Sequence, residues 1–189
     1  GADTLDGGTG ADRLEGGVGS DVYWFGRDSG SDTLVDRTDG GDVNEVRLRD
    51  LNAADVAFYS AANDVFLVSR VSGATLRLKG QVSTTVSERS VTALVFANGQ
   101  RWSDSDLLAN LSPSFTTPSQ AGATLAIMSG TSGADFLVDP VIRSNQYTVD
   151  HVGDRVFEAN NDSYGVLPQV ETVFSAVDFV LPENVENLN

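Results

Sequence analysis

The chain has 189 residues, enough for one large or two small domains, and no cysteine, which excludes disulfides, thiolate zinc sites and cysteine nucleophiles. Its 27 acidic residues outnumber its 12 basic ones and give a formal charge of -15. A surface of that charge repels nucleic acid phosphates, so we expect no DNA or RNA binding. No apolar run is long enough to form a transmembrane segment.

The first 36 residues repeat one short, glycine-rich pattern with a period of nine. Asp3, Asp12 and Asp21 are nine residues apart, and Asp32 follows after a two-residue insertion, Phe25 and Gly26. An apolar residue stands two places after each aspartate: Leu5, Leu14, Tyr23 and Leu34. A flexible, solvated loop would not keep this period over four copies, so the pattern predicts a folded repeat.

The repeat has the chemistry of a calcium site. Its glycines allow positive φ angles, which can aim carbonyl oxygens at one point, and its aspartate adds a carboxylate. Calcium prefers six to eight oxygen ligands, more than one loop supplies, but two stacked loops supply enough. If two repeats form one turn of a coil, Asp3 lies below Asp21 and Asp12 lies below Asp32.

The pattern resembles the calcium-binding nonapeptide repeat of RTX proteins, the haemolysin-type repeat. The resemblance implies a parallel β-roll with calcium ions (Ca2+) between the loops of successive turns. It also implies the ligands. A first site would use Gly1, Asp3, Gly16, Val18 and Asp21, and a second would use Gly8, Gly10, Asp12, Arg27, Ser29 and Asp32. A third, above Gly17, Gly19 and Asp21, would need Asp39 or Asp42, where the register is lost.

Residues 37–111 change to strand-like alternation. Val46 and Leu48 alternate with charged residues, a turn at 60–64 separates two further strands, and 75–78 and 91–96 follow. Asn98-Gly99 predicts a tight turn, and Ser103 can cap a short helix with an acidic first turn. This stretch resembles the haemolysin-type calcium-binding related domain. The resemblance rests on residues 51–56, 63–67 and 96–102. The resemblance implies an antiparallel β-rich capping domain on the roll.

The rest of the chain contains a linker and a second copy of the opening pattern. Residues 112–129 are rich in Pro, Ser and Thr and are predicted to be a linker. Residues 130–189 are predicted to form a second, degenerate RTX-like segment, with Asp135 as a further calcium ligand. A poorer copy follows it, with Asn145 in the place of the aspartate and Tyr147 in the place of the apolar residue.

Other chemistry receives less support. His151 is the chain's one histidine, and we expect it to be solvated rather than catalytic. Asp154 and Glu158 could be calcium ligands, but we rather expect them to form part of a solvated face. Four aromatic residues could line a sugar-binding surface but are more often core: Trp24, Phe25, Trp102 and Phe115.

We therefore expect a mainly β protein: a short parallel β-roll over 1–36, an antiparallel β segment with one short helix over 37–111, and a second RTX-like piece. The expected function is that of a non-enzymatic calcium-binding module in a secreted, extracellular bacterial RTX protein that folds when it binds calcium. The resemblance implies the type I secretion machinery as a partner, and the chain is expected to be a fragment of a longer protein. The alternative function is a carbohydrate- or surface-binding module of an adhesin or polysaccharide-active enzyme, with a glycan or cell surface as partner. An enzyme fragment using His151 stays open as a third.

Overall fold

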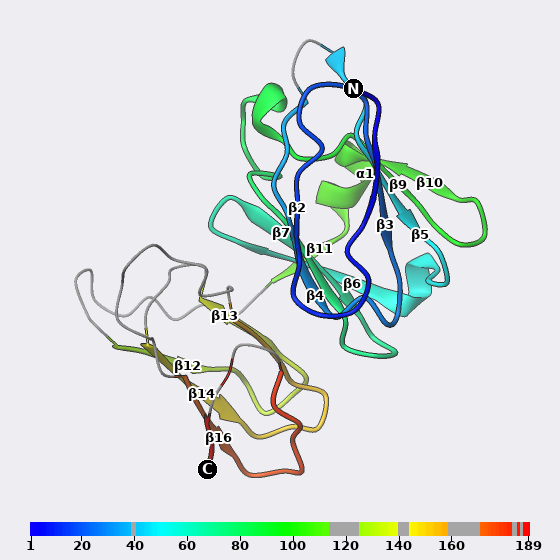
Figure 1. Cartoon of the computed structure of the whole chain (residues 1–189). Coiled ribbons are helices and arrows are strands. Elements are labelled where there is room, and N and C mark those ends of the chain that lie inside the picture. Colours follow the sequence, from blue (N-terminus) through cyan, green and yellow to red (C-terminus); the bar gives the residue numbers. More distant parts are fainter. Residues whose placement is uncertain (39–40, 114–124, 140–143, 159–170, 183–184, 186) are drawn as a thin grey trace. The chain divides into compact units, whose positions relative to one another are not determined.

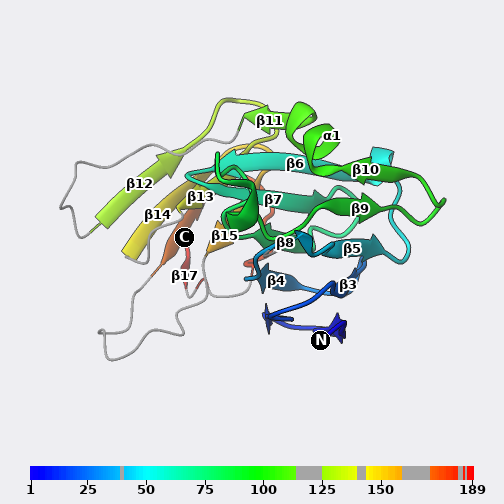
Figure 2. The ribbon, with the colours of Figure 1, turned by 90° about the horizontal axis from the view of Figure 1, so that it is seen from above.

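The computed structural model describes residues 1–38, 41–113, 125–139, 144–158, 171–182, 185 and 187–189. Its contacts divide the chain into two compact units, Gly1–Pro113 and Ser114–Asn189. Figures 1 and 2 show both from two directions. Among the described residues, no helix is both long and apolar enough to cross a bilayer. The division expected from the sequence, into 1–36, 37–111, 112–129 and 130–189, stays a prediction.

The first unit is a coil of short strands that alternate between two sheets. One sheet has the order β1-β3-β5-β9-β10 and the other β11-β6-β7-β8-β4-β2. In Figure 2 the strands of each sheet lie side by side. The strands are β1 (Thr4–Asp6), β2 (Arg13–Leu14), β3 (Val22–Phe25), β4 (Ser31–Leu34), β5 (Glu45–Leu48), β6 (Val56–Ala61), β7 (Asp64–Ser69), β8 (Thr75–Leu78), β9 (Ala93–Val95), β10 (Arg101–Ser103) and β11 (Leu111–Pro113).

The apolar residue of each repeat faces the interior. Leu14, Tyr23 and Leu34 are at most 6% exposed, and Leu5 packs against them. Their neighbours on either side point outward, because successive side chains of a strand face opposite ways. The mainly β architecture with a parallel roll, which the resemblance implies, is confirmed.

Parallel pairing continues beyond the repeats. β5 pairs in parallel with β3 and β9, and β8 pairs in parallel with β4. Among the described strands of this unit, antiparallel pairing is confined to β6 with β7, β7 with β8, and β9 with β10. The reason is that Val46 and Leu78 extend the inward columns of Tyr23 and Leu34, so they add turns to the same core. The segment after residue 36 thus both lengthens the roll and caps it.

The cap contains the predicted helix and turns. α1 spans Asp104–Ala109, and the Ser103 side chain accepts a hydrogen bond from the Asp106 N–H, as expected for its N-cap. The hairpin between β6 and β7 turns at residues 62–63, inside the predicted 60–64. Gly99 has a φ of 83°, which the turn requires. The cap also contains the short 3₁₀ helices η2 (Ala53–Asp55) and η3 (Val86–Glu88).

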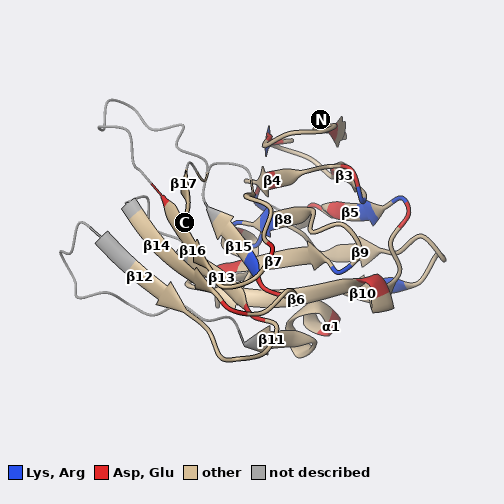
Figure 3. Cartoon of the chain, turned by 90° about the horizontal axis from the view of Figure 1, so that it is seen from below, with Lys and Arg blue, Asp and Glu red and all other residues tan. Residues whose placement is uncertain are grey.

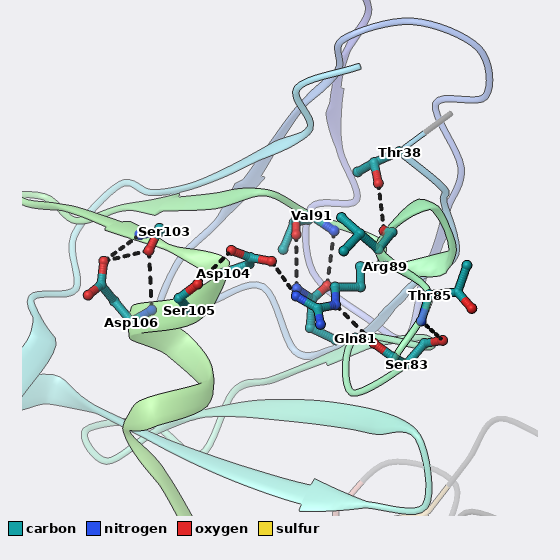
Figure 4. A network of polar contacts seen from close by, with 11 residues as sticks. Thr38, Gln81, Ser83, Thr85, Arg89, Val91, Ser103, Asp104, Ser105 and Asp106 are labelled. Atoms are coloured by element: carbon teal, nitrogen blue, oxygen red, sulfur yellow. Dashed lines mark hydrogen bonds and ion pairs between the residues drawn. The ribbon is translucent and has the colours of Figure 1, made fainter. Parts of the chain in front are cut away.

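A polar network holds the loop between β8 and β9 to the rest of the cap (Figure 4). The Gln81 side chain exchanges two hydrogen bonds with the backbone of Val91, at 2.9 and 3.0 Å. Arg89 donates to the Ser83 carbonyl and forms an ion pair with Asp104 at the start of α1. The Thr38 hydroxyl donates to the Val86 carbonyl, which attaches the chain just after the repeats to this loop.

The second unit is also a parallel two-sheet coil, as predicted for an RTX-like piece. Its sheets have the orders β12-β14-β16-β17 and β13-β15. Their bounds are β12 (Leu125–Ser129), β13 (Phe136–Asp139), β14 (Ser144–Val149), β15 (Arg155–Glu158), β16 (Thr172–Ser175) and β17 (Asn187–Leu188). The inward side chains form a separate core that includes Met128, Leu137, Tyr147, Val156 and Val173. The predicted linker, 112–129, lies mostly outside the described residues, and its ends contribute to β11 and β12.

Candidate calcium sites

The aspartates of successive turns are hydrogen-bonded to one another. The Asp3 N–H donates to Oδ1 of Asp21 at 2.7 Å, and the Asp12 N–H donates to Oδ1 of Asp32 at 3.1 Å. The parallel pairing of β1 with β3 and of β2 with β4 sets this register. The stacking of Asp3 with Asp21 and of Asp12 with Asp32, predicted from the spacing, is confirmed.

Glycines make the stacked loops possible. Gly8, Gly10, Gly17, Gly19 and Gly30 have φ angles between 78° and 125°, a range that L side chains avoid. At two of them the loop below is also close. A Cβ on Gly19 would lie 2.1 Å from the Gly1 carbonyl oxygen, and one on Gly30 would lie 2.2 Å from that of Gly10. The loop backbones thus approach each other closely enough to share an ion.

Two buried carboxylate oxygens fit a cation. Oδ2 of Asp12 and Oδ2 of Asp21 are inaccessible to solvent and accept no hydrogen bond within the described part of the chain. A Cβ on Gly16 would lie only 2.3 Å from Oδ2 of Asp21, so the loop leaves room for that oxygen only because glycine stands there. A buried polar group without a partner costs about 1–3 kcal/mol, and more when it is charged. A calcium ion would remove that cost.

Carboxylates alone do not form these sites. The described residues contain no group of three or more acidic or histidine side chains that could hold a metal ion. Backbone carbonyls must therefore supply further ligands. At the first site the amino group of Gly1 donates to the Val18 carbonyl at 2.6 Å and lies 3.7 Å from Oδ2 of Asp3. The Val18 carbonyl and the Asp3 carboxylate, two predicted ligands, thus both lie near Gly1.

The upper loop of the second site differs from the glycine loops. Arg27 and Asp28 stand where glycines are expected. Neither has a positive φ, since Ala62 is the one described non-glycine residue that has one. The loop closes instead through Ser29, whose Oγ accepts a hydrogen bond from the Gly26 N–H at 3.0 Å. Arg27 is held by Asp50, 3.7 Å from its Nε. The predicted carbonyl ligands Arg27 and Ser29 therefore lie in a turn of a different kind.

The register that the sequence loses after Asp36 is regained in the structure. The Asp21 N–H donates to Oδ1 of Asn44 at 3.0 Å, and the Gly19 N–H donates to Oδ2 of Asp42 at 3.2 Å. Asn44 thus occupies the place of the next aspartate in the column, and sequence reasoning missed it. The available signal was Val46, an inward apolar residue two places after a polar one. Asp39 lies outside the described residues.

A buried network connects this column to the end of the repeats. The Tyr23 hydroxyl donates to the Asp36 carboxylate and accepts a hydrogen bond from the Gly16 N–H at 2.9 Å. The Asn44 amide also donates to Asp36, at 3.1 Å. Burial raises the pKa of Asp36, while the hydrogen bond from Tyr23 opposes the shift. Burial, together with the hydrogen bond to Asp36, also raises the pKa of Tyr23 far above its ordinary value.

Asp135, the predicted ligand in the second unit, is satisfied within its own loop. Its carboxylate accepts hydrogen bonds from the N–H and hydroxyl of Thr131. Its N–H donates to Oδ1 of Asp154 at 2.9 Å, the same arrangement as in the first unit. Asp154 is 2% exposed, so the preferred expectation of a solvated face is wrong for this residue. The structure describes the backbone of Glu158 but not its side chain.

The other predicted positions have structural roles. Asn145 and Tyr147 are fully buried, as the place of Tyr147 in the degenerate repeat predicts, and Tyr147 pairs with Val173 of the next turn. His151 Nδ1 accepts a hydrogen bond from the Gly153 N–H in a tight turn. Trp102 packs on Phe58 and Phe96, with ring centroids 5.5 and 4.9 Å apart, and Phe25 is buried. Phe115 lies outside the described residues.

Comparisons with known proteins agree with this geometry. Residues 1–34 match the family model of the RTX calcium-binding nonapeptide repeat, in four copies. The chain thus carries an RTX-type calcium-binding segment, and calcium is the ion that such repeats bind. The match ends at residue 34, so the related domain expected over 37–111 stays a prediction.

The chain is also similar to a solved structure, the extracellular lipase LipA from Serratia marcescens, at 14% identity and a TM-score of 0.44. The similarity covers 99% of this chain and 31% of the lipase, so the chain spans about a third of that protein. A search of curated proteins finds no significant match.

Proposed function

We propose that the chain is a non-catalytic structural module of a secreted protein and that it folds when it binds calcium outside the cell. The observation that carries the proposal is the pair of buried carboxylate oxygens, on Asp12 and Asp21, that accept no hydrogen bond in the described residues. Without a cation these charges disfavour the compact state. Calcium binding and folding are then one equilibrium.

Calcium concentration would decide where the module folds. Extracellular calcium modules bind at about 10⁻⁴–10⁻³ M, far above cytosolic calcium. The roll would stay unfolded inside the cell and fold after export. A chain that is unfolded before export suits the type I secretion machinery, which we propose as the partner of the whole protein. The -15 charge strengthens the coupling, because bound cations offset repulsion among the carboxylates.

Circular dichroism of a chelated sample titrated with calcium tests the proposal. The β-sheet signal should rise with calcium, and magnesium at the same concentration should not replace calcium, because magnesium demands a tighter octahedral site. A spectrum that is identical with and without calcium would contradict the folding switch.

A saccharide-binding function is the second candidate. Exposed aromatic residues in a row would favour it, but Phe25 is buried and Trp102 is packed in the cap, so Trp24, Phe25 and Trp102 do not form such a row. One specific observation still favours this function: a depression beside Trp24 on the outer face of the roll.

A further inference from the structure

A row of two charged side chains and one aromatic side chain crosses the outer face of the first sheet. Asp6, Trp24 and Arg47 are direct neighbours on β1, β3 and β5. The residues before Asp6, Trp24 and Arg47 point into the core, so these three point outward. Neighbouring strands are about 4.8 Å apart, which lets one ligand contact all three side chains. Figure 3 shows basic and acidic segments together around β3, β5 and β10.

Arg49 is held against this row by two contacts. Its guanidinium lies 2.6 Å from Oδ2 of Asp6, and its backbone N–H donates a hydrogen bond to the Phe25 carbonyl at 3.0 Å. Its stem passes so close to Gly26 that a Cβ there would lie 2.9 Å from Arg49 Cγ. Gly26 belongs to the two-residue insertion that interrupts the nine-residue period. The departure from the repeat therefore makes room for Arg49.

The side chains of Asp6, Trp24 and Arg49 line an open depression of about 290 Å³. Ligand pockets commonly start at about 300 Å³, so this depression suits one or two sugar rings. An indole offers an apolar face with a polar edge, and a guanidinium binds a carboxylate through two parallel hydrogen bonds. The Asp6 carboxylate is paired with Arg49 and has further oxygen lone pairs that can accept hydrogen bonds from hydroxyl groups.

The local charge differs from that of the chain. Glu45 binds both Arg47 and Arg101, and Asp6 binds Arg49, so three arginines face two carboxylates and leave one net positive charge. The whole chain carries -15. Such a chain repels a long polyanion, but this patch attracts a single carboxylate on a short ligand.

We propose that Asp6, Trp24 and Arg49 form a binding site for a saccharide end that carries one uronate carboxylate. The sugar ring stacks on Trp24, the carboxylate binds the guanidinium of Arg49 with Arg47 beside it, and hydroxyl groups donate to Asp6. The site rests on the proposed function, because this sheet face exists only in the folded, calcium-loaded roll.

Calorimetry at saturating calcium tests the site with matched pairs of disaccharides. The probes end in glucuronate, galacturonate or mannuronate, and each partner probe has the corresponding neutral hexose. At least one uronate probe should bind more tightly than its neutral partner. Trp24→Ala and Arg49→Gln should each weaken that binding about tenfold or more. Trp24→Phe keeps an aromatic face and should retain most of it.

Arg13→Gln is the matched control. Arg13 is also an outward, ion-paired arginine, 53% exposed, but it lies on the other sheet, so this variant should bind as the wild type does. Circular dichroism of each variant with calcium separates a lost site from a lost fold. The proposal is overturned if no uronate probe exceeds its neutral partner, or if folded Trp24→Ala and Arg49→Gln variants bind as Arg13→Gln does. A chain that does not fold with calcium refutes the folding proposal instead.

Discussion

The backbone N–H of Asp21 donates a hydrogen bond of 3.0 Å to Oδ1 of Asn44, 23 residues later in the chain. The same bond joins Asp3 to Asp21 one turn below. Asn44 therefore continues the column of aspartates with an amide instead of a carboxylate. Its Nδ2 donates to Asp36 and to the carbonyls of Arg37 and Ser90, which an aspartate could not do.

Replacing Asn44 should uncouple the repeats from the segment that caps them. Asn44→Ala leaves the Asp21 N–H and Asp36 without this partner in a buried site, so we expect a loss of about 2–4 kcal/mol in the free energy of unfolding. Asn44→Asp keeps the acceptor but places a negative charge beside Asp36, so it should also destabilise. Urea unfolding at saturating calcium measures both. A loss below about 0.5 kcal/mol for Asn44→Ala would show that the amide network is dispensable.

Asp12 should matter more for calcium than Asp135. Oδ2 of Asp12 is buried without a hydrogen bond in the described residues, whereas Thr131 satisfies the carboxylate of Asp135. We expect Asp12→Ala to weaken calcium affinity by about tenfold or more and Asp135→Ala by less than about threefold. Calorimetric calcium titration of the two variants measures this difference. Equal effects would mean that the Asp135 loop is also a full calcium site.

Two glycines of similar φ should respond differently to alanine. Gly30 (φ 78°) would place a Cβ 2.2 Å from the Gly10 carbonyl oxygen, whereas Gly8 (φ 84°) has open space around it. Gly8→Ala should cost about 1 kcal/mol, the conformational cost alone. Gly30→Ala must also push the stacked loops apart, so it should cost several-fold more and weaken calcium binding. Thermal unfolding with calcium compares the pair, and similar melting temperatures would contradict the close stacking.

Asp36 should make stability depend on pH. Burial raises its pKa in the folded state above the unfolded value of about 3.9, so the folded state binds more protons between the two values. The contribution of Asp36 to stability is therefore present below about pH 4 and is lost as pH rises through the folded pKa.

Asp36→Asn removes this titration and keeps an oxygen that can accept from Tyr23 and Asn44. The difference in unfolding free energy between wild type and variant should therefore fall as pH rises from about 4 and then level off. Both proteins are compared at saturating calcium, so that they carry the same bound ions. A difference that does not change with pH would show that the folded pKa is not raised.

The repeat made much of the first unit predictable. The inward places of Leu14, Tyr23 and Leu34 and the stacking of Asp12 with Asp32 follow from a fixed spacing, because side chains in a strand alternate and equal repeats stack. The resemblance to RTX repeats added the parallel pairing. Ser103 as an N-cap and Asn98-Gly99 as a turn were predictable for local reasons.

Other features depend on long-range contacts that the spacing of the repeat does not predict. The register of Asn44 follows a 23-residue step through a loop of irregular length, and the structure fixes it through Val46 in the core and through a hydrogen bond to the Ser90 carbonyl. The burial of Asp154 and the route of Arg49 over Gly26 arise in the same way, from neighbours distant in the chain. Local chemistry thus specified the calcium-binding repeat and its inward residues. Long-range packing decided where the roll ends, which oxygens are left buried without a hydrogen bond and what its outer face presents, because each depends on backbone segments that meet only after folding.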